Sequence, residues 1–551
     1  MSQSAGHLIV RTLEAHGVEQ VFAVPGESYL DVLDGLHDSA IETVVCRHEG
    51  GAGFMALAAG RLTGKPGVAM VTRGPGAANA MIAIHTAWQD ATALILFVGL
   101  VPVADRERDA FQEFSLTGWF GSTAKRVLTI DDPDRAGELV DEAFRIASSG
   151  RPGPVVIGLP EDLLQRVTDA PVSTPTAPAT PTPAAQELES LAARLAAAER
   201  PAFVLGGDGW HNGSGRAIAA FAEAAGVPVF TDWRAYDAVP HDAESWGGWL
   251  GYGRADSVAS AYAESDLLVF VGCIRSDVLS DGYTRGFEAE TVLVLADPNA
   301  ATHAGRIDQQ ILATPETFAA ALAASDPVAA RGERGDSWMR GRAHVQQQFA
   351  RHRADAEVAG APDPAPQGVD LGTAFGLLDD RLGGDAILTY GAGNATIWAH
   401  RFVRHLQPAS LVGARNGAMG LAVPAAVAAS IVFPDRRAVA VCGDGDFMMN
   451  GQEVATAFAH GGAPLVIVVD NGIYGTIVQH QEREYPGRPS GTTMVNPNFA
   501  DWMRSFGGHG EHVTRTEDFA AALDRSLAAD GPALIHVVID SSVMPPASSE
   551  V

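Results

Sequence analysis

Two polar turns follow neighbouring apolar stretches in the last third of the chain. Residues 437–442 are mostly apolar and lead into the letters GDG, whose aspartate is Asp444, and residues 464–469 lead into DNG, which is centred on Asn471. The 27 positions from Asp444 to Asn471 leave room for one helix and one strand. A carboxylate and an amide oxygen at one sheet edge suit Mg²⁺, which keeps its other positions for phosphate oxygens and water. Taken singly, each motif is also an ordinary tight turn.

The elements that must position these turns are a strand before each and a helix after the first. Residues 447–458 are expected to form that helix. Its N-terminal end would lie at the carboxyl end of a parallel strand, where α/β folds bind phosphates. A bound Mg²⁺ would offset the repulsion between an acidic turn and an anionic cofactor.

The whole chain alternates apolar runs with amphipathic stretches. The runs are VEQVFAV, IETVVC, GVAMVT, TALILFVGL and PVVIGLP in the first third, PAFVLGG, VPVFTD, DLLVFVG and ETVLVLAD in the second, and AILTYG, RAVAVCGDG, APLVIVVDN and PALIHVVID in the last. Continuous apolar runs between helical stretches are typical of parallel sheets that are covered on both faces. The sequence therefore predicts an α/β fold of three consecutive doubly wound parallel-sheet domains.

Two proline-rich stretches mark the predicted boundaries. Residues 169–186 and 359–368 contain proline and alanine without an apolar period, a composition typical of extended connectors. They separate three domains at residues 1–168, 187–358 and 369–551, and each has the size of a single domain.

Composition narrows the classes of partner. The 551 residues carry 66 acidic and 38 basic side chains, a formal charge of −28, which repels nucleic-acid backbones and anionic lipid surfaces. The longest apolar run, residues 91–103, is shorter than the roughly 20 residues that span a bilayer. The N-terminus has no signal-peptide pattern, and Cys46, Cys273 and Cys442 are widely separated. We therefore expect a cytoplasmic protein that binds neither nucleic acid nor membrane.

Several motifs together resemble one family. An aspartate in GDG followed 27 positions later by an asparagine resembles the thiamine diphosphate motif. The stretches VFAVPGESYLDVLDGL and CRHEGGAGFMALAAGRLTGKPGVAMVTRGPGAANA resemble the pyrimidine-binding domain of the acetohydroxyacid (acetolactate) synthase family. The segments ADRERDAFQEF, GRPGPVVIGLPEDL and NPNFADWMRSFG extend this likeness over essentially the whole chain. The resemblance implies a pyrimidine-binding, a central Rossmann-like and a diphosphate-binding domain, with thiamine diphosphate and Mg²⁺ as cofactors.

The resemblance gives two residues a chemical role. Glu49 matches the glutamate that hydrogen-bonds N1′ of the aminopyrimidine, where a carboxylic acid favours the imino tautomer that removes the C2 proton of the cofactor. Met419 matches the bulky apolar residue that holds the cofactor in a V shape. Without the resemblance, Glu49 is a typical acid of a first helical turn and Met419 a typical core methionine.

The remaining cofactor contacts are also implied by the resemblance. Asp444 and Asn471 would bind the metal through their side chains, and Ile473 through its carbonyl. Asn394 stands where the family has a diphosphate-contacting glutamine, and asparagine keeps both a donor and an acceptor. The other predicted cofactor-binding residues are Pro25, Gly26, Asn79, Gly443, Gly445, Asp446 and Tyr474, of which Gly445 and Asp446 would offer backbone N–H groups.

Four residues are predicted to serve the substrates. Phe111 and Gln112 lie in a segment that resembles the family's substrate channel, contributed by the neighbouring subunit. Lys125 matches a lysine near the channel mouth and would steer an anionic 2-oxo acid, or else it is simply an exposed lysine. His480 stands in place of a tryptophan that favours 2-oxobutyrate as second substrate. It is either a polar contact for a more oxygenated acceptor or a surface histidine.

The middle third departs from the family pattern. Where the family has a flavin-contacting Arg-Phe-Asp-Asp-Arg, this chain reads RSDVLSD at residues 275–281, and the turn at residues 208–213 is no GxGxxG motif. The sequence therefore disfavours FAD.

The predicted activity is that of an acetolactate-synthase-like carboligase and lyase. A 2-oxo acid such as pyruvate would lose CO₂, and its acyl carbanion would be transferred to a second carbonyl. The alternatives are a 2-oxo acid decarboxylase without carboligation, a flavin-dependent pyruvate oxidase, and an inactive cofactor-binding scaffold subunit. Because the domains that carry Glu49 and Asp444 pair across a dimer interface in the family, we expect a homodimer or homotetramer with active sites at the subunit interface.

Overall fold

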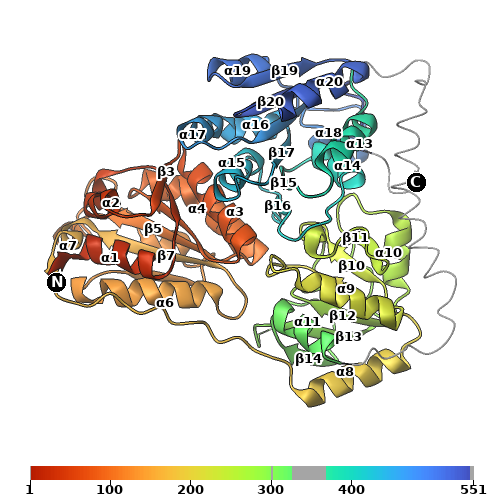
Figure 1. Ribbon diagram of the computed structural model, residues 1–551, viewed down its shortest axis with the longest axis horizontal. Coiled ribbons are helices and arrows are strands. Elements are labelled where there is room, and N and C mark those ends of the chain that lie inside the picture. The colour runs from red at the N-terminus through yellow and green to blue at the C-terminus, as the bar shows by residue number, and fades with distance from the viewer. Residues whose placement is uncertain (1, 300–301, 326–367, 546–551) are drawn as a thin grey trace. The chain divides into compact units, whose positions relative to one another are not determined.

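The computed structural model describes residues 2–299, 302–325 and 368–545. Three sheets of six parallel strands follow one another along the chain and are accompanied by helices (Figure 1). This confirms the predicted α/β fold with three parallel sheets. The predicted linker at 359–368 falls almost wholly outside the described residues, and so does the predicted end of the central domain at residue 358.

The first sheet has the strand order β3-β2-β4-β5-β7-β6. Its strands are β2 (Gln20–Ala23), β3 (Glu42–Val45), β4 (Gly67–Val71), β5 (Leu94–Leu100), β6 (Arg126–Thr129) and β7 (Pro154–Pro160). A separate two-stranded antiparallel pair joins β1 (Gln3–Ser4) to β8 (Val167–Thr168).

Helices cover both faces of the first sheet. Alternate residues of its strands pack with α1 (Ala5–Ala15) and α6 (Ala136–Ser148) in one hydrophobic core. The intervening residues face the other way, because side chains alternate along a strand. There, α3 (Glu49–Thr63) and α4 (Pro75–Asp90) contact the strands and each other. The first residue of α3 is thus delivered to the carboxyl end of the sheet.

The central sheet has the order β11-β10-β9-β12-β13-β14, which is that of a dinucleotide-binding doubly wound fold. Its strands are β9 (Pro201–Leu205), β10 (Val229–Asp232), β11 (Trp246–Leu250), β12 (Leu267–Val271), β13 (Glu290–Leu295) and β14 (Gln309–Leu312).

The third sheet has the order β16-β15-β17-β18-β20-β19. Its strands are β15 (Ile387–Tyr390), β16 (Leu411–Gly413), β17 (Ala438–Gly443), β18 (Leu465–Asp470), β19 (His509–Val513) and β20 (Ala533–Val538). Strands β17 and β18 are parallel neighbours, which confirms that the GDG and DNG turns leave the sheet at the same edge.

The helix after GDG differs from the prediction of one helix over residues 447–458. Helix α16 (Asp444–Asn450) begins three residues earlier, at the aspartate itself, and a 3₁₀ turn at Gly451–Glu453 separates it from α17 (Val454–Ala459). Asn450 leaves the helical conformation and donates its side-chain amide to the Gly420 carbonyl at 2.8 Å, which explains the break.

The other helices connect or flank these sheets. They are α2 (Leu30–His37), α5 (Leu116–Phe120), α7 (Glu161–Leu164), α8 (Ala185–Ala197), α9 (Ser214–Ala225), α10 (Asp256–Ala263), α11 (Pro315–Ala323), α13 (Leu371–Leu382), α14 (Asn394–Phe402), α15 (Ala422–Val432), α18 (Gly475–Glu484), α19 (Phe499–Ser505) and α20 (Thr516–Leu527).

The described residues form two compact units. One contains the first sheet together with residues 414–435 and 448–464. The other contains the central and third sheets, whose apolar side chains form a common core. Within the described ranges, no helix is both long and apolar enough to cross a membrane.

Candidate active site

Two carboxylates meet where β17 and β18 end. Asp444 is buried, and its Oδ2 accepts hydrogen bonds from the Gly472 N–H at 3.1 Å and the Asn496 side-chain amide at 2.7 Å. Oδ1 of Asp470 accepts from the same two donors, each at 2.9 Å. Gly472 and Asn496 therefore hold both carboxylates together, and neither was predicted from the sequence pattern.

The two carboxylates differ in how readily they take a proton. Burial, followed by the neighbouring Asp470, raises the pKa of Asp444 to about 6. Burial would also raise the pKa of Asp470, but hydrogen bonds, first of all from His536, outweigh it and lower that pKa. Nε2 of His536 lies 2.9 Å from Asp470, and its Nδ1 accepts the Phe499 N–H, so Nε2 carries the proton. A divalent cation beside Asp444 would remove the repulsion between the pair.

The turn after β18 is braced by the segment that follows α18. The Tyr474 N–H donates to the Thr492 carbonyl and the Met494 N–H to the Gly472 carbonyl, each at 2.8 Å. Oδ1 of Asn471 accepts the Ile473 N–H at 3.2 Å. The predicted metal-binding residues Asn471 and Ile473 are thus fixed in one ordered turn next to Asp444.

A small space without a side chain separates two amide groups of this site. A Cβ on Gly475 would lie 3.1 Å from Nδ2 of Asn394 and 3.1 Å from Nδ2 of Asn471. Nδ2 of Asn394 is buried and has no hydrogen-bond partner among the described residues, while Oδ1 accepts from the Thr476 hydroxyl at 3.1 Å. This buried N–H donor lacks an acceptor, and Gly475 leaves room for one. An anionic phosphate oxygen would fit there.

Within the described residues, no cluster of three or more His, Cys, Asp or Glu side chains could hold a metal ion by itself. A metal at Asp444 and Asn471 would therefore need further oxygen ligands from a diphosphate and water, as Mg²⁺ commonly does. Asp444, Asn471 and Asn394 therefore fit Mg²⁺ and a diphosphate bound together better than either of them bound alone.

The glycine-rich turn itself is tightly packed. The Gly445 N–H donates to Oδ1 of Asp444 at 2.9 Å, and a Cβ at Gly445 would lie 2.6 Å from the Tyr474 ring. Beside Gly443, by contrast, an added Cβ would meet only a carbonyl at 4.0 Å. The buried Asp446 accepts the Ala392 N–H at 2.6 Å and so ties the turn after β15 to α16.

In the other unit, Glu49 is the first residue of α3 and is half-buried. Its Oε2 accepts a hydrogen bond from the Asn79 side-chain amide at 2.9 Å. Its Oε1 lies over Gly76, where a Cβ would come within 3.3 Å. The structure thus brings together two residues that the sequence assigned to the pyrimidine side of the cofactor, with a glycine beside the second oxygen of Glu49.

The loop that carries Pro25 and Gly26 is held in place by contacts with Thr72 and Arg73. A Cβ on Gly26 would lie 2.4 Å from Cβ of Thr72, so this position requires glycine. The buried guanidinium of Arg73 binds Glu27 at 2.9 Å and Glu161 at 2.8 Å, which links the segments that follow β2, β4 and β7.

Met419 is held on a short rigid loop. It is half-buried and lies between Gly417 and Gly420. Their φ angles of +68° and +84° are left-handed, a conformation that glycine adopts far more readily than other residues. The Arg415 N–H before it donates to Asp90 at 2.7 Å. This fixed placement suits a prop for a ligand at least as well as a core side chain.

The predicted substrate segment is an ordered, exposed loop. Phe111 is 75% exposed, and Gln112 has a left-handed backbone (φ +62°) that packs against Gly74. The carboxylate of Glu113 closes the loop by accepting the N–H groups of Glu107 at 2.6 Å and Ala110 at 3.0 Å. These backbone hydrogen bonds lower the pKa of Glu113.

Lys125 and His480, the other two residues predicted to serve the substrates, both contact groups of the protein. The Lys125 ammonium donates to the carbonyls of Ile146 and Ser149, each at 2.5 Å, and thereby caps the C-terminus of α6. That is a structural task which the sequence pattern did not indicate. His480 is exposed on α18, with Nδ1 2.9 Å from the Arg483 guanidinium.

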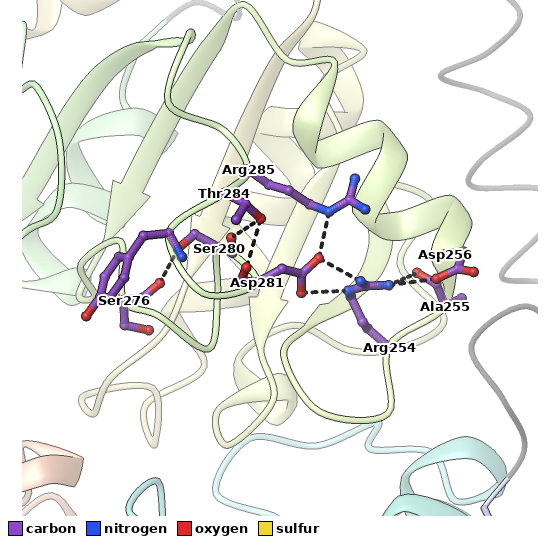
Figure 2. Close-up of polar contacts among 9 residues, drawn as sticks. Arg254, Ala255, Asp256, Ser276, Ser280, Asp281, Thr284 and Arg285 are labelled. Atoms are coloured by element: carbon purple, nitrogen blue, oxygen red, sulfur yellow. Dashed lines mark hydrogen bonds and ion pairs between the residues drawn. The ribbon is translucent and has the colours of Figure 1, made fainter. Parts of the chain in front are cut away.

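The unit with the central and third sheets contains a cavity of about 500 Å³. Arg254 and Asp281 line it, and Figure 2 shows their contacts: the carboxylate of Asp281 lies between the guanidinium groups of Arg254 and Arg285, both at 2.6 Å. Arg254 also binds Asp256 at 3.0 Å. Carboxylates thus already neutralise Arg254, which leaves it less available to bind the diphosphate of a flavin dinucleotide.

Arg275, which begins the stretch that replaces the family's flavin-contacting motif, is also committed elsewhere. Its side chain is fully buried, donates to the Ala304 carbonyl at 2.9 Å and the Thr291 hydroxyl at 2.8 Å, and stacks over Phe270 and Phe287. It stabilises the core of the central sheet.

Comparison with known families assigns all three sheets to one class of enzyme. Residues 3–119 match the thiamine pyrophosphate enzyme N-terminal TPP-binding domain, residues 188–322 the central domain, and residues 391–537 the C-terminal TPP-binding domain. Thiamine pyrophosphate is another name for thiamine diphosphate. The fold and the three matches define a thiamine pyrophosphate enzyme.

Comparison with individual proteins identifies the family within this class. The chain is 30% identical to the acetolactate synthase isozyme 2 large subunit of Escherichia coli K12, over 98% of this chain and 97% of the relative. It is 32% identical to the isozyme 1 large subunit of the same organism (98% and 94%), and 29% identical to the chloroplastic acetolactate synthase 1 of Nicotiana tabacum (97% and 81%). The chain belongs to the acetolactate synthase large-subunit family.

Proposed function

We propose that this chain is a thiamine diphosphate- and Mg²⁺-dependent carboligase. It would decarboxylate a 2-oxo acid such as pyruvate and transfer the acyl unit to a second carbonyl compound. The observation that carries the proposal is the group formed by Asp444, Asn471 and Asn394, in which oxygen ligands for a metal stand beside a buried donor for a phosphate oxygen. The family matches at both ends of the chain support it.

The third sheet supplies the residues that hold the diphosphate end. Asp444, Asn471 and the carbonyl of Ile473 would coordinate Mg²⁺. The phosphate oxygens would be met by Asn394 and by the segment from Gly443 to Asp446, with Tyr474 packed over Gly445. When bound, the cofactor supplies an electron sink for the loss of CO₂ from a 2-oxo acid.

The first unit supplies the residues that handle the proton. Glu49 would hold a proton on Oε1 and share it with a ring nitrogen of the pyrimidine, while Asn79 keeps Oε2 in place. Pro25, Gly26 and Met419 would enclose that ring and exclude water from it.

The remaining assignments concern the substrate. Phe111 and Gln112 would line the approach to the site, and His480 would contact the second substrate. Lys125 would steer an anionic acid only if its ammonium left the carbonyls that it caps in the structure.

We propose a homodimer or homotetramer that works in the cytoplasm, with the domain boundaries predicted from the sequence. No flavin belongs to this proposal, because Arg254 and Arg275 are already bound by protein groups. A pyruvate oxidase would need that flavin, and a scaffold subunit would not need the Glu49–Asn79 pair.

Proton NMR of pyruvate incubated with the protein, Mg²⁺ and thiamine diphosphate tests the proposal, with a cofactor-free sample as control. Cofactor-dependent acetolactate or acetoin is the expected product. Acetaldehyde alone would move the protein to the decarboxylases. Pyruvate left intact would exclude it as donor and send the search to bulkier or more oxidised 2-oxo acids.

A further inference from the structure

Glu453 is a fully buried carboxylate that none of the roles above uses. It ends the 3₁₀ turn between α16 and α17, and its side chain has no exposed surface. Burying a carboxylate without a paired cation is costly unless hydrogen bonds satisfy its oxygens. Burial raises the pKa of Glu453, and hydrogen bonds from Thr456 and from two backbone N–H groups oppose that rise.

The partners of Glu453 are the two residues directly before Glu49. Oε1 accepts the N–H of His48 at 2.9 Å and that of Arg47 at 3.2 Å, and Oε2 accepts the Arg47 N–H at 3.2 Å and the Thr456 hydroxyl at 2.7 Å. All of these residues belong to the same compact unit. A segment about 400 positions away in the sequence thus fixes the backbone that leads into α3.

The geometry around the helix start leaves little freedom. His48 is the N-cap of α3, and its Nδ1 accepts the Gly50 N–H at 3.0 Å. A Cβ on Gly51 would lie 2.5 Å from Oε1 of Glu453, so the carboxylate reaches the helix only because this position is glycine. An anion at a helix N-terminus also interacts favourably with the helix dipole.

We propose that Glu453 is a positioning residue for Glu49: by gripping the N–H groups of Arg47 and His48 it fixes the direction in which the Glu49 carboxylate leaves α3. The inference rests on the proposed role of Glu49. A carboxylate can accept all of these hydrogen bonds at once, whereas a glutamine would turn an NH₂ group toward one of the donors. The charge state and not merely the size of the side chain therefore matters.

The first test compares Glu453→Gln with wild-type protein in the absence of cofactor. Amide hydrogen exchange in the peptide that covers residues 46–52 should become about fivefold faster or more, as expected when a buried hydrogen bond is lost. Asp379→Asn is the matched control, because Asp379 is also buried and accepts the Arg404 N–H at 2.9 Å. That control should leave exchange in 46–52 unchanged. Unchanged exchange in Glu453→Gln would overturn the proposal.

The second test follows the proton chemistry directly. With thiamine diphosphate and Mg²⁺ in D₂O, the rate at which the C2 proton of the cofactor exchanges should fall roughly 10–100-fold in Glu453→Gln, the size of effect that small misplacements of catalytic groups produce. Asp379→Asn should keep the wild-type rate. In the Glu49→Gln background the second substitution should cost nothing further, because Glu453 acts through Glu49. Additive losses would mean that Glu453 is merely structural.

Two further outcomes can be distinguished from those above: a variant that does not fold, and a wild-type protein that binds no cofactor. If Glu453→Gln does not fold, Gly51→Ala presses on the same carboxylate and Thr456→Val removes one of its donors, and both should slow C2 exchange by less. Wild-type rates in both would overturn the proposal. If the wild-type protein binds no thiamine diphosphate, the proposed function fails, while amide exchange still reports whether Glu453 anchors residues 47 and 48.

Discussion

The first and third sheets are built alike and end differently. When the strands of each are numbered in chain order, both sheets have the order 2-1-3-4-6-5. After the strands of the first sheet, the guanidinium of Arg73 binds Glu27 and Glu161, and the neutral amide of Asn79 binds Glu49. After the strands of the third sheet, two carboxylates converge on the same two neutral donors.

The comparison shows that two sheets with the same strand order can carry sites of different chemistry. The first sheet offsets part of its negative charge with the Arg73 guanidinium and presents the Glu49 carboxylate at the start of α3. The third sheet concentrates negative charge that a divalent cation would neutralise. We therefore expect proton transfer to depend on the first unit and cofactor retention to depend on the third sheet. The first three predictions below separate these two functions, and the others compare the stability of the two units.

The largest effect is expected from Asp444→Asn, which removes a predicted metal ligand. Losing only an outer-shell partner costs roughly 10–100-fold in metal affinity, so the Mg²⁺ concentration that gives half-maximal activity should rise by more than about 100-fold. A Mg²⁺ titration of pyruvate decarboxylation measures this. An unchanged midpoint would remove Asp444 from the metal site.

Glu49→Gln should have an effect of comparable size and should act on rate alone. Loss of general acid–base catalysis typically costs about 10²–10⁴-fold, so kcat should fall by that factor while the Mg²⁺ midpoint stays near the wild-type value. Steady-state kinetics at saturating cofactor provide the measurement. A variant that keeps wild-type kcat would contradict the assignment.

Asn496→Ala should weaken the metal site without touching a ligand. The side-chain amide of Asn496 holds both Asp444 and Asp470, so its loss should cost roughly 10–100-fold in Mg²⁺ affinity. Asn498→Ala, two positions away, removes the N-cap of α19 and serves as the control. Equal behaviour of the two variants would show that Asn496 has no part in orienting the carboxylates.

The unit with the central and third sheets should also be the more sensitive to acid. Burial lowers the pKa of His241 to about 3 and those of His400 and His405 well below 6.5. Since the unfolded chain binds these protons first, stability is complete above pH 6.5 and falls below it, by about 1.4 kcal/mol per pH unit for each histidine.

His400→Phe tests this directly, because neither ring nitrogen of His400 has a hydrogen-bond partner among the described residues. Urea unfolding at pH 7.5, 6.5 and 5.5 should show a shallower pH slope, because one of the five described histidines in this unit whose pKa is lowered is removed, the others being His241, His303, His405 and His512. The same slope as in the wild type would place the acid sensitivity elsewhere.

The smallest effect is expected from Lys125→Met in the first unit. Removing a cation from the C-terminal carbonyls of α6 should cost about 0.3–2 kcal/mol of stability, measured by thermal or urea unfolding. If Lys125 only caps the helix, kcat/KM for pyruvate should keep its value and its salt dependence. A lower kcat/KM with a weaker salt dependence would instead support a steering role.

The fold was predictable where strands are buried in the interior of a sheet. Of the eighteen strands in the three large sheets that the structure describes, those without an apolar run in the sequence analysis are β6, β11, β14, β16 and β19, and all five lie at sheet edges. An edge strand is covered less and needs fewer apolar residues, so HGEHV in β19 carries no such pattern.

The site was predictable where the spacing within one strand–turn–helix unit decides it. Asp444 and Asn471 follow from adjacent strands, and the structure places those strands side by side. Asn496 and Glu453 could not be found in this way, because their importance comes from contacts with residues distant in the sequence. Glu453 does stand in the stretch GDGDFMMNGQE and within the helix predicted over residues 447–458, and an acidic residue at that place was the one signal available.

Calorimetric titration of thiamine diphosphate into wild-type, Glu49→Gln and Asp444→Asn proteins, with and without Mg²⁺, tests the division of labour most directly. We expect wild-type and Glu49→Gln proteins to bind with similar affinity and only when Mg²⁺ is present, and Asp444→Asn to bind weakly in both conditions. Tight binding to Asp444→Asn, or binding that ignores Mg²⁺, would contradict the account.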